Sequence, residues 1–296
     1  MYAEKPLTAT WNEARRSLQI VEDAGIPFCV GHNRRCSPAM VRALEIFRNH
    51  MASPQDCPWR FNRPGWDSID VKGQDGVPFV SIRINDDWRS WKFIHLTGQN
   101  SEFGLLLGEM THFVDLARHF LDAEAVRVFA MHNGILNHAV SIEFANQAIV
   151  NISMFSNGTF GYPKELIEAA GNGGIVVCDH MLEIRTAGID GAEPLEKFSF
   201  LSDRHPDIGR EGGLSGWLAK KQAACREAEE TGDPLRQFTA EPNKGHALLL
   251  EEFIREIRGE RPPVSPIKDA VEVTRICLAA LKSAAEKRVV TVKEIV

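Results

Sequence analysis

The stretch AVRVFAMHNGILNHAVSIEFANQAIVNISMFS, residues 125–156, decides the fold class. Its three short runs alternate apolar with polar residues, and the gaps between them hold Asn, Gly and Ala. Alternation is typical of strands with one buried face, and successive strands with hairpin-length gaps predict antiparallel pairing. Similar runs continue downstream, so residues 124–200 predict one large, mostly antiparallel sheet.

Helical patterns flank this sheet on both sides. Residues 105–121 are apolar nearly all round their first turns, which predicts one buried helix. Three more helices are predicted at 214–230, 243–258 and 268–287, followed by a last short strand in VVTVKEI. We expect the last two helices to cover the inner face of the sheet with their apolar residues, which include Leu249, Phe253, Ile254, Ile257 and Ile276.

The first residues have an α/β pattern instead. Thr10 and Glu13 form a capping box before an apolar stripe, and Gly25 is a helix stop. IPFCVGH, residues 26–32, then indicates a buried strand. Such a strand needs a parallel neighbour, and we expect no earlier strand in this chain to supply one. A helix from Ser37, an irregular stretch and a strand in VPFVSIRIND complete the α/β to α+β layout.

Composition excludes several classes of protein. The net charge is −6 without a basic block, so no nucleic-acid footprint is present. No apolar run approaches the roughly 18 residues of a membrane helix, and no signal peptide is visible. The six cysteines are scattered without a C-x-x-C pair, which indicates reduced thiols in a cytoplasmic protein and no metal site.

His112 is the strongest candidate for chemistry. It lies in the first turns of the helix entered through Gly104 and Gly108, with Glu109 three residues before it and Asp115 three residues after it. A histidine flanked by carboxylates suits general acid–base catalysis. The alternative is a core histidine whose ring nitrogens bind those same carboxylates.

Other candidates carry weaker signals. Lys5, between an acid and a proline, suits proton transfer or binding of a substrate oxygen, but also fits an exposed terminus. Residues 33–35 follow a buried strand, where ligands bind in open α/β sheets, but also fit a solvated basic turn. Trp88 and Trp91 suit either a sugar pocket or a core. His180 has no patterned partner and receives no role.

Five segments together resemble the glucose–fructose oxidoreductase/inositol dehydrogenase (Gfo/Idh/MocA) family. They are AEKPLTAT at 3–10, GHNRRCSP at 31–38, FGLLLGEMTHFVDL at 103–116, YPKELIEAAG at 162–171 and NKGHALLLEEFIREI at 243–257. The resemblance implies an N-terminal Rossmann domain that binds NAD or NADP. It also implies a C-terminal α+β domain that binds substrate and forms dimers or tetramers through its open sheet.

The resemblance also sets the expected domain boundaries. In the family, Glu-Lys-Pro lies late in the Rossmann domain, whereas here it begins at residue 4. Residues 1–35 are therefore expected to be the C-terminal remnant of a Rossmann domain, and 36–296 the substrate-binding and oligomerisation domain. No G-x-G-x-x-G occurs in the sequence, so about 90 residues of a longer reading frame are expected upstream of a misplaced start at Met1.

Residue roles are carried over position by position. Lys5 and His112 match the catalytic pair, with Lys5 near the nicotinamide and His112 the acid/base. One departure concerns Gly108, where inositol dehydrogenases carry an aspartate, so Glu109 or Asp115 is expected to orient the histidine. The residues expected to bind substrate are Asn33, Arg34, Glu109 and Asp115, and those expected to bind cofactor are Glu4, Lys5, Pro6 and Asn33.

Three functions remain open from the sequence. The first is an NAD(P)-dependent oxidoreductase acting on a hydroxyl of a sugar, sugar derivative or cyclitol. The second is an NAD-dependent glycoside hydrolase, and the third is a non-catalytic binding or oligomerisation module. The expected partners are a small sugar or polyol and further copies of the chain, with no nucleic acid and no membrane.

Overall fold

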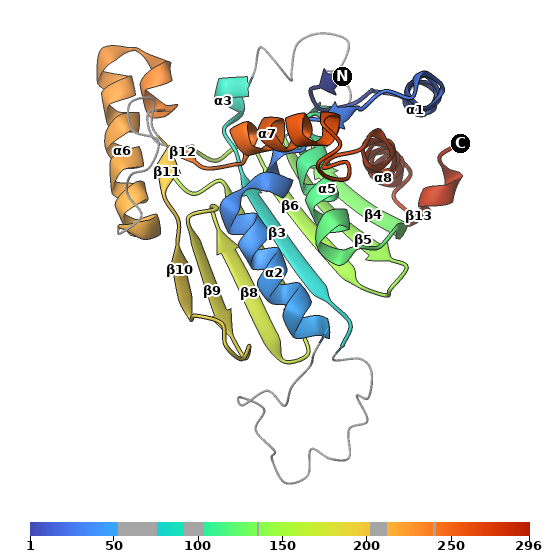
Figure 1. Cartoon of the computed structure of the whole chain (residues 1–296). Helices are drawn as coiled ribbons and strands as arrows, with labels where there is room; N and C mark the ends of the chain where they lie inside the picture. Colours follow the sequence, from blue (N-terminus) through green and yellow to red (C-terminus); the bar gives the residue numbers. More distant parts are fainter. Residues whose placement is uncertain (53–75, 92–103, 135, 202–211, 239–240) are drawn as a thin grey trace.

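The computed structural model describes residues 1–52, 76–91, 104–134, 136–201, 212–238 and 241–296 (Figure 1). Most of the irregular stretch expected at 52–78 lies outside these residues. None of the helices in the described part has the length and apolar character that a membrane span requires.

A nine-stranded sheet forms the body of the protein, with the strand order β10-β9-β8-β7-β3-β6-β5-β4-β13. Only β3 and β6 pair in parallel within it, so the expectation of a large, mostly antiparallel sheet is confirmed. The strands are β3 (Phe79–Asn85), β4 (Ala125–Asn133), β5 (Asn137–Phe144), β6 (Ile149–Phe155), β7 (Glu165–Gly171), β8 (Gly174–Asp179), β9 (Glu183–Ala187), β10 (Leu195–Lys197) and β13 (Val290–Thr291).

Helices cover one face of this sheet (Figure 1). They are α2 (Pro38–Ala52), α5 (Met110–Leu121) and α8 (Ile267–Glu286). The strands alternate as their sequences predict: Val150, Ile152 and Met154 are buried, whereas Ile149 and Ser153 face outward. The inward residues and the helices share one main core.

The remaining elements surround this layer. They are α1 (Trp11–Ala24), the 3₁₀ turn η1 (Asn33–Cys36), α3 (Trp88–Trp91), α4 (Gly104–Gly108), β11 (Phe200–Leu201), α6 (Gly213–Thr231), η2 (Pro234–Phe238), β12 (Glu241–Pro242), α7 (His246–Ile257) and η3 (Val292–Glu294). The Thr10 side chain accepts a hydrogen bond from Glu13 N at 3.3 Å and Gly25 adopts a left-handed φ of 60°, so both expected ends of α1 are confirmed.

The expectation of no strand before α1 is wrong. Residues Tyr2–Ala3 form β1, which pairs in parallel with β2 (Cys29–Val30). The pair is only two residues long on each side, too short to produce an alternating pattern in the sequence. This short pair places Glu4 and Lys5 directly after one strand and η1 shortly after the other.

Two helical expectations also need correction. The helix expected at 105–121 is two helices, α4 and α5, interrupted at Glu109. In α7, Leu249 and Phe253 are buried, but Ile254 and Ile257 are 48% and 55% exposed. The buried side of α7 packs on η1 and β2, so this helix does not cover the large sheet.

Candidate functional site

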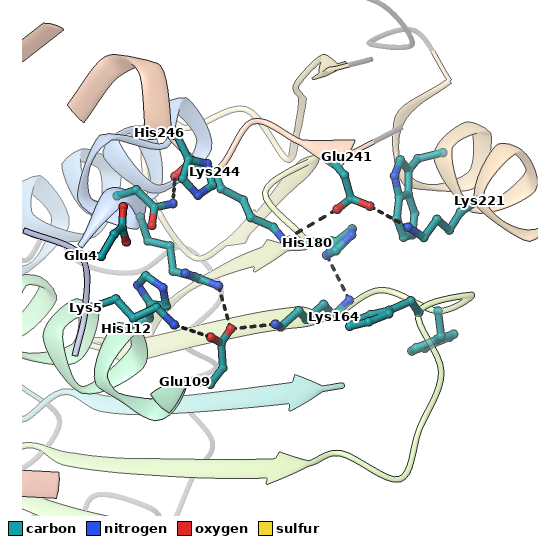
Figure 2. Close-up of a pocket in the computed structure, with 15 residues that line it drawn as sticks. Glu4, Lys5, Glu109, His112, Lys164, His180, Lys221, Glu241, Lys244 and His246 are labelled. Carbon is teal, nitrogen blue, oxygen red and sulfur yellow. Dashed lines mark hydrogen bonds and ion pairs between the residues drawn. The ribbon is translucent and has the colours of Figure 1, made fainter. Parts of the chain in front are cut away.

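A cavity of about 490 Å³ lies where the β1–β2 pair, the α4–α5 junction, α6 and α7 meet (Figure 2). Ionisable and aromatic side chains dominate its wall. The lining residues are Glu4, Lys5, Asn33, Arg34, Glu109, His112, Phe160, Tyr162, Lys164, His180, Trp217, Lys221, Glu241, Lys244 and His246.

Glu109 is the centre of charge at one end of this cavity. The break between α4 and α5 frees its side chain, which binds Lys164 Nζ at 2.7 Å, Lys5 Nζ at 2.8 Å and Arg34 Nη2 at 3.3 Å. Burial alone raises the pKa of a carboxyl group, but the three cations outweigh it and hold the pKa of Glu109 well below its ordinary value. Glu109 is therefore a charged support for the lysines.

Lys5 reaches the same point from the other side of the fold. Its Nζ donates to Gly108 O at 2.7 Å as well as to Glu109 Oε2. An ammonium group has three donors, and the described residues take two of them. Lys5 therefore keeps one N–H for a molecule in the cavity that it lines.

His112 lines the cavity beside this network and is buried. Its Nδ1 atom has no hydrogen-bond partner among the described residues. Burial, followed by the nearby charges of Arg34 and Lys5, lowers the pKa of His112 well below its ordinary value. The imidazole is therefore neutral at physiological pH.

The two flanking carboxylates do not bind His112, against both expectations drawn from the sequence. Glu109 forms ion pairs with its three cations. Asp115 accepts two hydrogen bonds of 2.6 and 2.8 Å from Arg35. His32 Nδ1 also lies 3.0 Å from Asp115 Oδ1. Spacing along a helix places side chains on adjoining faces. In the structure, however, both carboxylates bind cationic or imidazole side chains from other parts of the chain.

The structure gathers most of the sequence-predicted residues at one place. Glu4, Lys5, Asn33, Arg34, Glu109 and His112 line the cavity. Asp115 and Pro6 do not, and Asp115 is buried beneath η1.

Asn33 and Arg34 hold their places through contacts across the chain. Asn33 Nδ2 donates to Lys244 O at 2.6 Å, and Arg34 binds Glu165 at 2.6 and 3.0 Å. Trp88 does not line the cavity, and the side chain of Trp91 lies outside the described residues.

Several lining residues were not given roles from the sequence. Lys164, which precedes β7, binds Glu109 and also lies 3.0 Å from Asp86 Oδ2. Lysine is rarely buried, so nothing in the local sequence marked Lys164. His180 had no signal either, because it occupies a left-handed turn with a φ of 53°, which the sequence does not mark.

The described residues hold no group of three or more His, Cys, Asp or Glu side chains that could bind a metal ion.

The structure is thus a sheet covered by helices on one face, with a charged cavity at its end. The family model described as "Oxidoreductase family, C-terminal alpha/beta domain" (GFO_IDH_MocA_C) matches residues 85–292. The match spans more than half of the chain, and the chain therefore belongs to the Gfo/Idh/MocA oxidoreductase family.

Solved structures share this fold at low sequence identity. A probable dehydrogenase from Thermotoga maritima is 20% identical with a TM-score of 0.64, covering 99% of this chain and 74% of its own. An oxidoreductase from Agrobacterium radiobacter in complex with NAD+, L-tartaric acid and magnesium is 16% identical with a TM-score of 0.65, covering 100% and 73%. A putative myo-inositol dehydrogenase from Sinorhizobium meliloti 1021 is 17% identical with a TM-score of 0.60, covering 98% and 73%. No curated protein matches this sequence.

Proposed function

We propose that the protein is an NAD(P)-dependent oxidoreductase that acts on a hydroxyl group of a sugar, sugar derivative or cyclitol. The observation that supports this most directly is the meeting of Lys5 and His112 in one cavity from segments 107 residues apart in the sequence (112 − 5). Family membership and the NAD+ bound to the Agrobacterium radiobacter neighbour support the same reaction class.

The two residues have complementary tasks in this proposal. Oxidation of an alcohol releases a proton from the hydroxyl group, and neutral His112 has a ring-nitrogen lone pair to accept it. As the proton leaves, negative charge grows on the oxygen, and the remaining N–H of Lys5 stabilises it. Glu109 fixes Lys5 in place by the 2.8 Å ion pair.

The cavity wall also suits a carbohydrate ring. Trp217 and Phe160 supply apolar surface, while Lys164, Glu241 and Lys244 supply donors and acceptors for hydroxyl groups. The cavity volume of about 490 Å³ falls within the usual range of small-molecule sites.

The described residues fit only the nicotinamide end of the proposed cofactor. Glu4, Lys5 and Asn33 reach the cavity from the ends of the short parallel pair. The sequence offers no G-x-G-x-x-G whose backbone N–H groups would hold a diphosphate. When bound, NAD(P) supplies the hydride acceptor.

The test combines nucleotide binding with turnover. Titrating NAD(H) and NADP(H) into the purified chain by calorimetry should give saturable binding, and a panel of sugars and inositols should then reduce the nucleotide. His112→Asn and Lys5→Met should each lower kcat at least ~100-fold. Lys220→Met is the matched control, because Lys220 is exposed outside the cavity. A folded chain that binds neither nucleotide would favour a non-catalytic binding module instead.

A further inference from the structure

At the end of the cavity away from Glu109, two lysines pair with the same carboxylate (Figure 2). Glu241 accepts a hydrogen bond of 2.6 Å from Lys221. Lys244 Nζ lies 3.7 Å from the other carboxylate oxygen of Glu241, beyond hydrogen-bond distance. One carboxylate therefore faces two ammonium groups.

The other cations of the cavity are already matched. Lys5 binds Glu109, Lys164 binds both Glu109 and Asp86, and Arg34 binds Glu165 through two hydrogen bonds. After Glu241, Glu165 is the carboxylate that most raises the pKa of Lys244. Both oxygens of Glu165, however, accept hydrogen bonds from the guanidinium of Arg34. Among the ammonium groups that line the cavity, Lys244 thus has the weakest compensation from described carboxylates.

A second, independent group at this end also lacks a partner. The Nδ1 atom of His180 accepts a hydrogen bond from Lys164 N at 3.1 Å, which assigns the ring proton to Nε2. His180 is 2% exposed, and its Nε2 has no hydrogen-bond partner among the described residues. Buried donors are nearly always satisfied, so an unsatisfied donor in a cavity wall points to a ligand atom.

Burial reinforces this reading. Burial lowers the pKa of Lys244, and the negative charges of Glu241 and Glu165 cancel only part of this decrease. It also lowers the pKa of His180 well below its ordinary value, so His180 is a neutral N–H donor. An incoming anion would gain a charge-assisted bond from Lys244 and restore the balance of charge.

We propose that the Lys244–His180 end of the cavity binds a carboxylate of the substrate, so that the substrate is an acidic sugar or sugar acid. One oxygen of the carboxylate binds the ammonium of Lys244, and the other accepts the Nε2–H of His180. A single negative charge matches the one cavity ammonium that lacks a carboxylate within hydrogen-bond distance, which favours a carboxylate over a doubly charged phosphate. This inference rests on the proposed function, because it takes the anion to be a substituent of the molecule whose hydroxyl group meets His112.

The position of the pair gives the carboxylate an orienting task. The backbone oxygen of Lys244 also accepts a hydrogen bond of 2.6 Å from Asn33 Nδ2. This bond links the backbone of Lys244 to the end of the cavity near Lys5. A substrate group that binds far from the reacting carbon helps to position that carbon. Substrates that lack such a group therefore react more slowly.

The test compares ligands that differ only in the acidic group. Calorimetry on the full chain without nucleotide would titrate D-glucose, D-galactose and myo-inositol against D-glucuronate, D-galacturonate and D-gluconate, with glucose 6-phosphate as the phosphate arm. We expect at least one carboxylate to bind at least ~10-fold more tightly than its neutral counterpart. Lys244→Met should weaken that binding ~10–100-fold, Lys244→Arg should restore most of it, and Lys220→Met should change nothing.

Four results would overturn the proposal. They are equal binding of neutral and acidic ligands, binding of none of the carboxylates, tighter binding of glucose 6-phosphate, and unchanged carboxylate binding by folded Lys244→Met. Circular dichroism of each variant establishes folding. Because the titration contains no nucleotide, carboxylate binding without any turnover would contradict only the oxidoreductase proposal. If the Lys244→Met variant turned over neutral sugars as fast as the wild type does, only the proposed carboxylate site would be contradicted.

Discussion

Lys5 and His112 are linked by charge as well as by the cavity that they share. Burial and the positive charges of Arg34 and Lys5 all lower the pKa of His112, while Glu109 raises it. Replacing Lys5 with Met removes one cation and should move the pKa of His112 upward. The imidazole then starts to gain its proton at a higher pH than in the wild type. Nitrogen-detected NMR titration of the histidine side chains measures this shift directly.

The matched control for this titration is Lys220→Met, which removes a lysine outside the cavity. It should leave the His112 titration unchanged. A His112 pKa that stays the same or falls in Lys5→Met would show that the two side chains are not electrostatically coupled. This readout needs neither substrate nor nucleotide, so it is independent of the proposed reaction.

Glu109 is expected to support the fold as well as the site. Glu109→Gln leaves Lys5, Arg34 and Lys164 facing one another without their shared carboxylate. Loss of one partner from a buried ionic cluster costs about 3–5 kcal/mol of unfolding free energy. Urea denaturation measures it, and Glu286→Gln, which breaks an exposed pair with Lys282, should have almost no effect. Equal stability of the two variants would contradict the central role of Glu109.

At the scale of elements, Gly245 fixes how α7 meets η1. Its φ is +84°, and a Cβ there would lie 2.5 Å from backbone atoms of Asn33, Cys36 and Ser37. Gly245→Ala must therefore push α7 away from η1, which moves Lys244 and His246 at the cavity. We expect a loss of unfolding free energy greater than the roughly 1–2 kcal/mol of left-handed strain alone, measured by urea denaturation.

Gly232→Ala separates strain from collision. Gly232 has a similar φ of +68°, but a Cβ there meets nothing within 4 Å. This control should lose only the strain energy. If both variants lost the same amount, close packing of α7 on η1 would not be the reason for glycine at residue 245.

Elements with a long repeating pattern were predictable from the sequence, and tertiary pairings were not. The alternation of 125–156 and the capping box of α1 are local, so they could be read directly. The β1–β2 pair is two residues long, and Glu109, at the break between α4 and α5, binds three cations from distant parts of the sequence. At the site, His112 and Lys5 were candidates from their neighbouring residues and were paired by the resemblance, whereas Lys244 and His180 matter through contacts that only the folded chain creates.

At the scale of the whole molecule, the sheet face that lies away from the described helices, here called the open face, supports the proposal of a homo-oligomer. Helices α2, α5 and α8 cover the opposite face. On the open face, Ile149 pairs with Phe79 and Ala170 pairs with both Phe79 and Ile175, so the four residues form one apolar row across β6, β3, β7 and β8. Phe79, Ile149 and Ile175 are 44%, 43% and 36% exposed. Apolar rows of this kind mark association surfaces.

We therefore expect dimers or tetramers in sedimentation-velocity measurements over a range of protein concentrations. Phe79→Lys places a charge in the middle of the row, where desolvation would oppose association, and should shift the population to monomer. Ile20→Lys is the matched control, because Ile20 is 57% exposed on α1, away from the sheet. A wild-type chain that stays monomeric at high concentration, or a Phe79→Lys variant that associates as the wild type does, would place the interface elsewhere. The open sheet would then need another explanation for its apolar row.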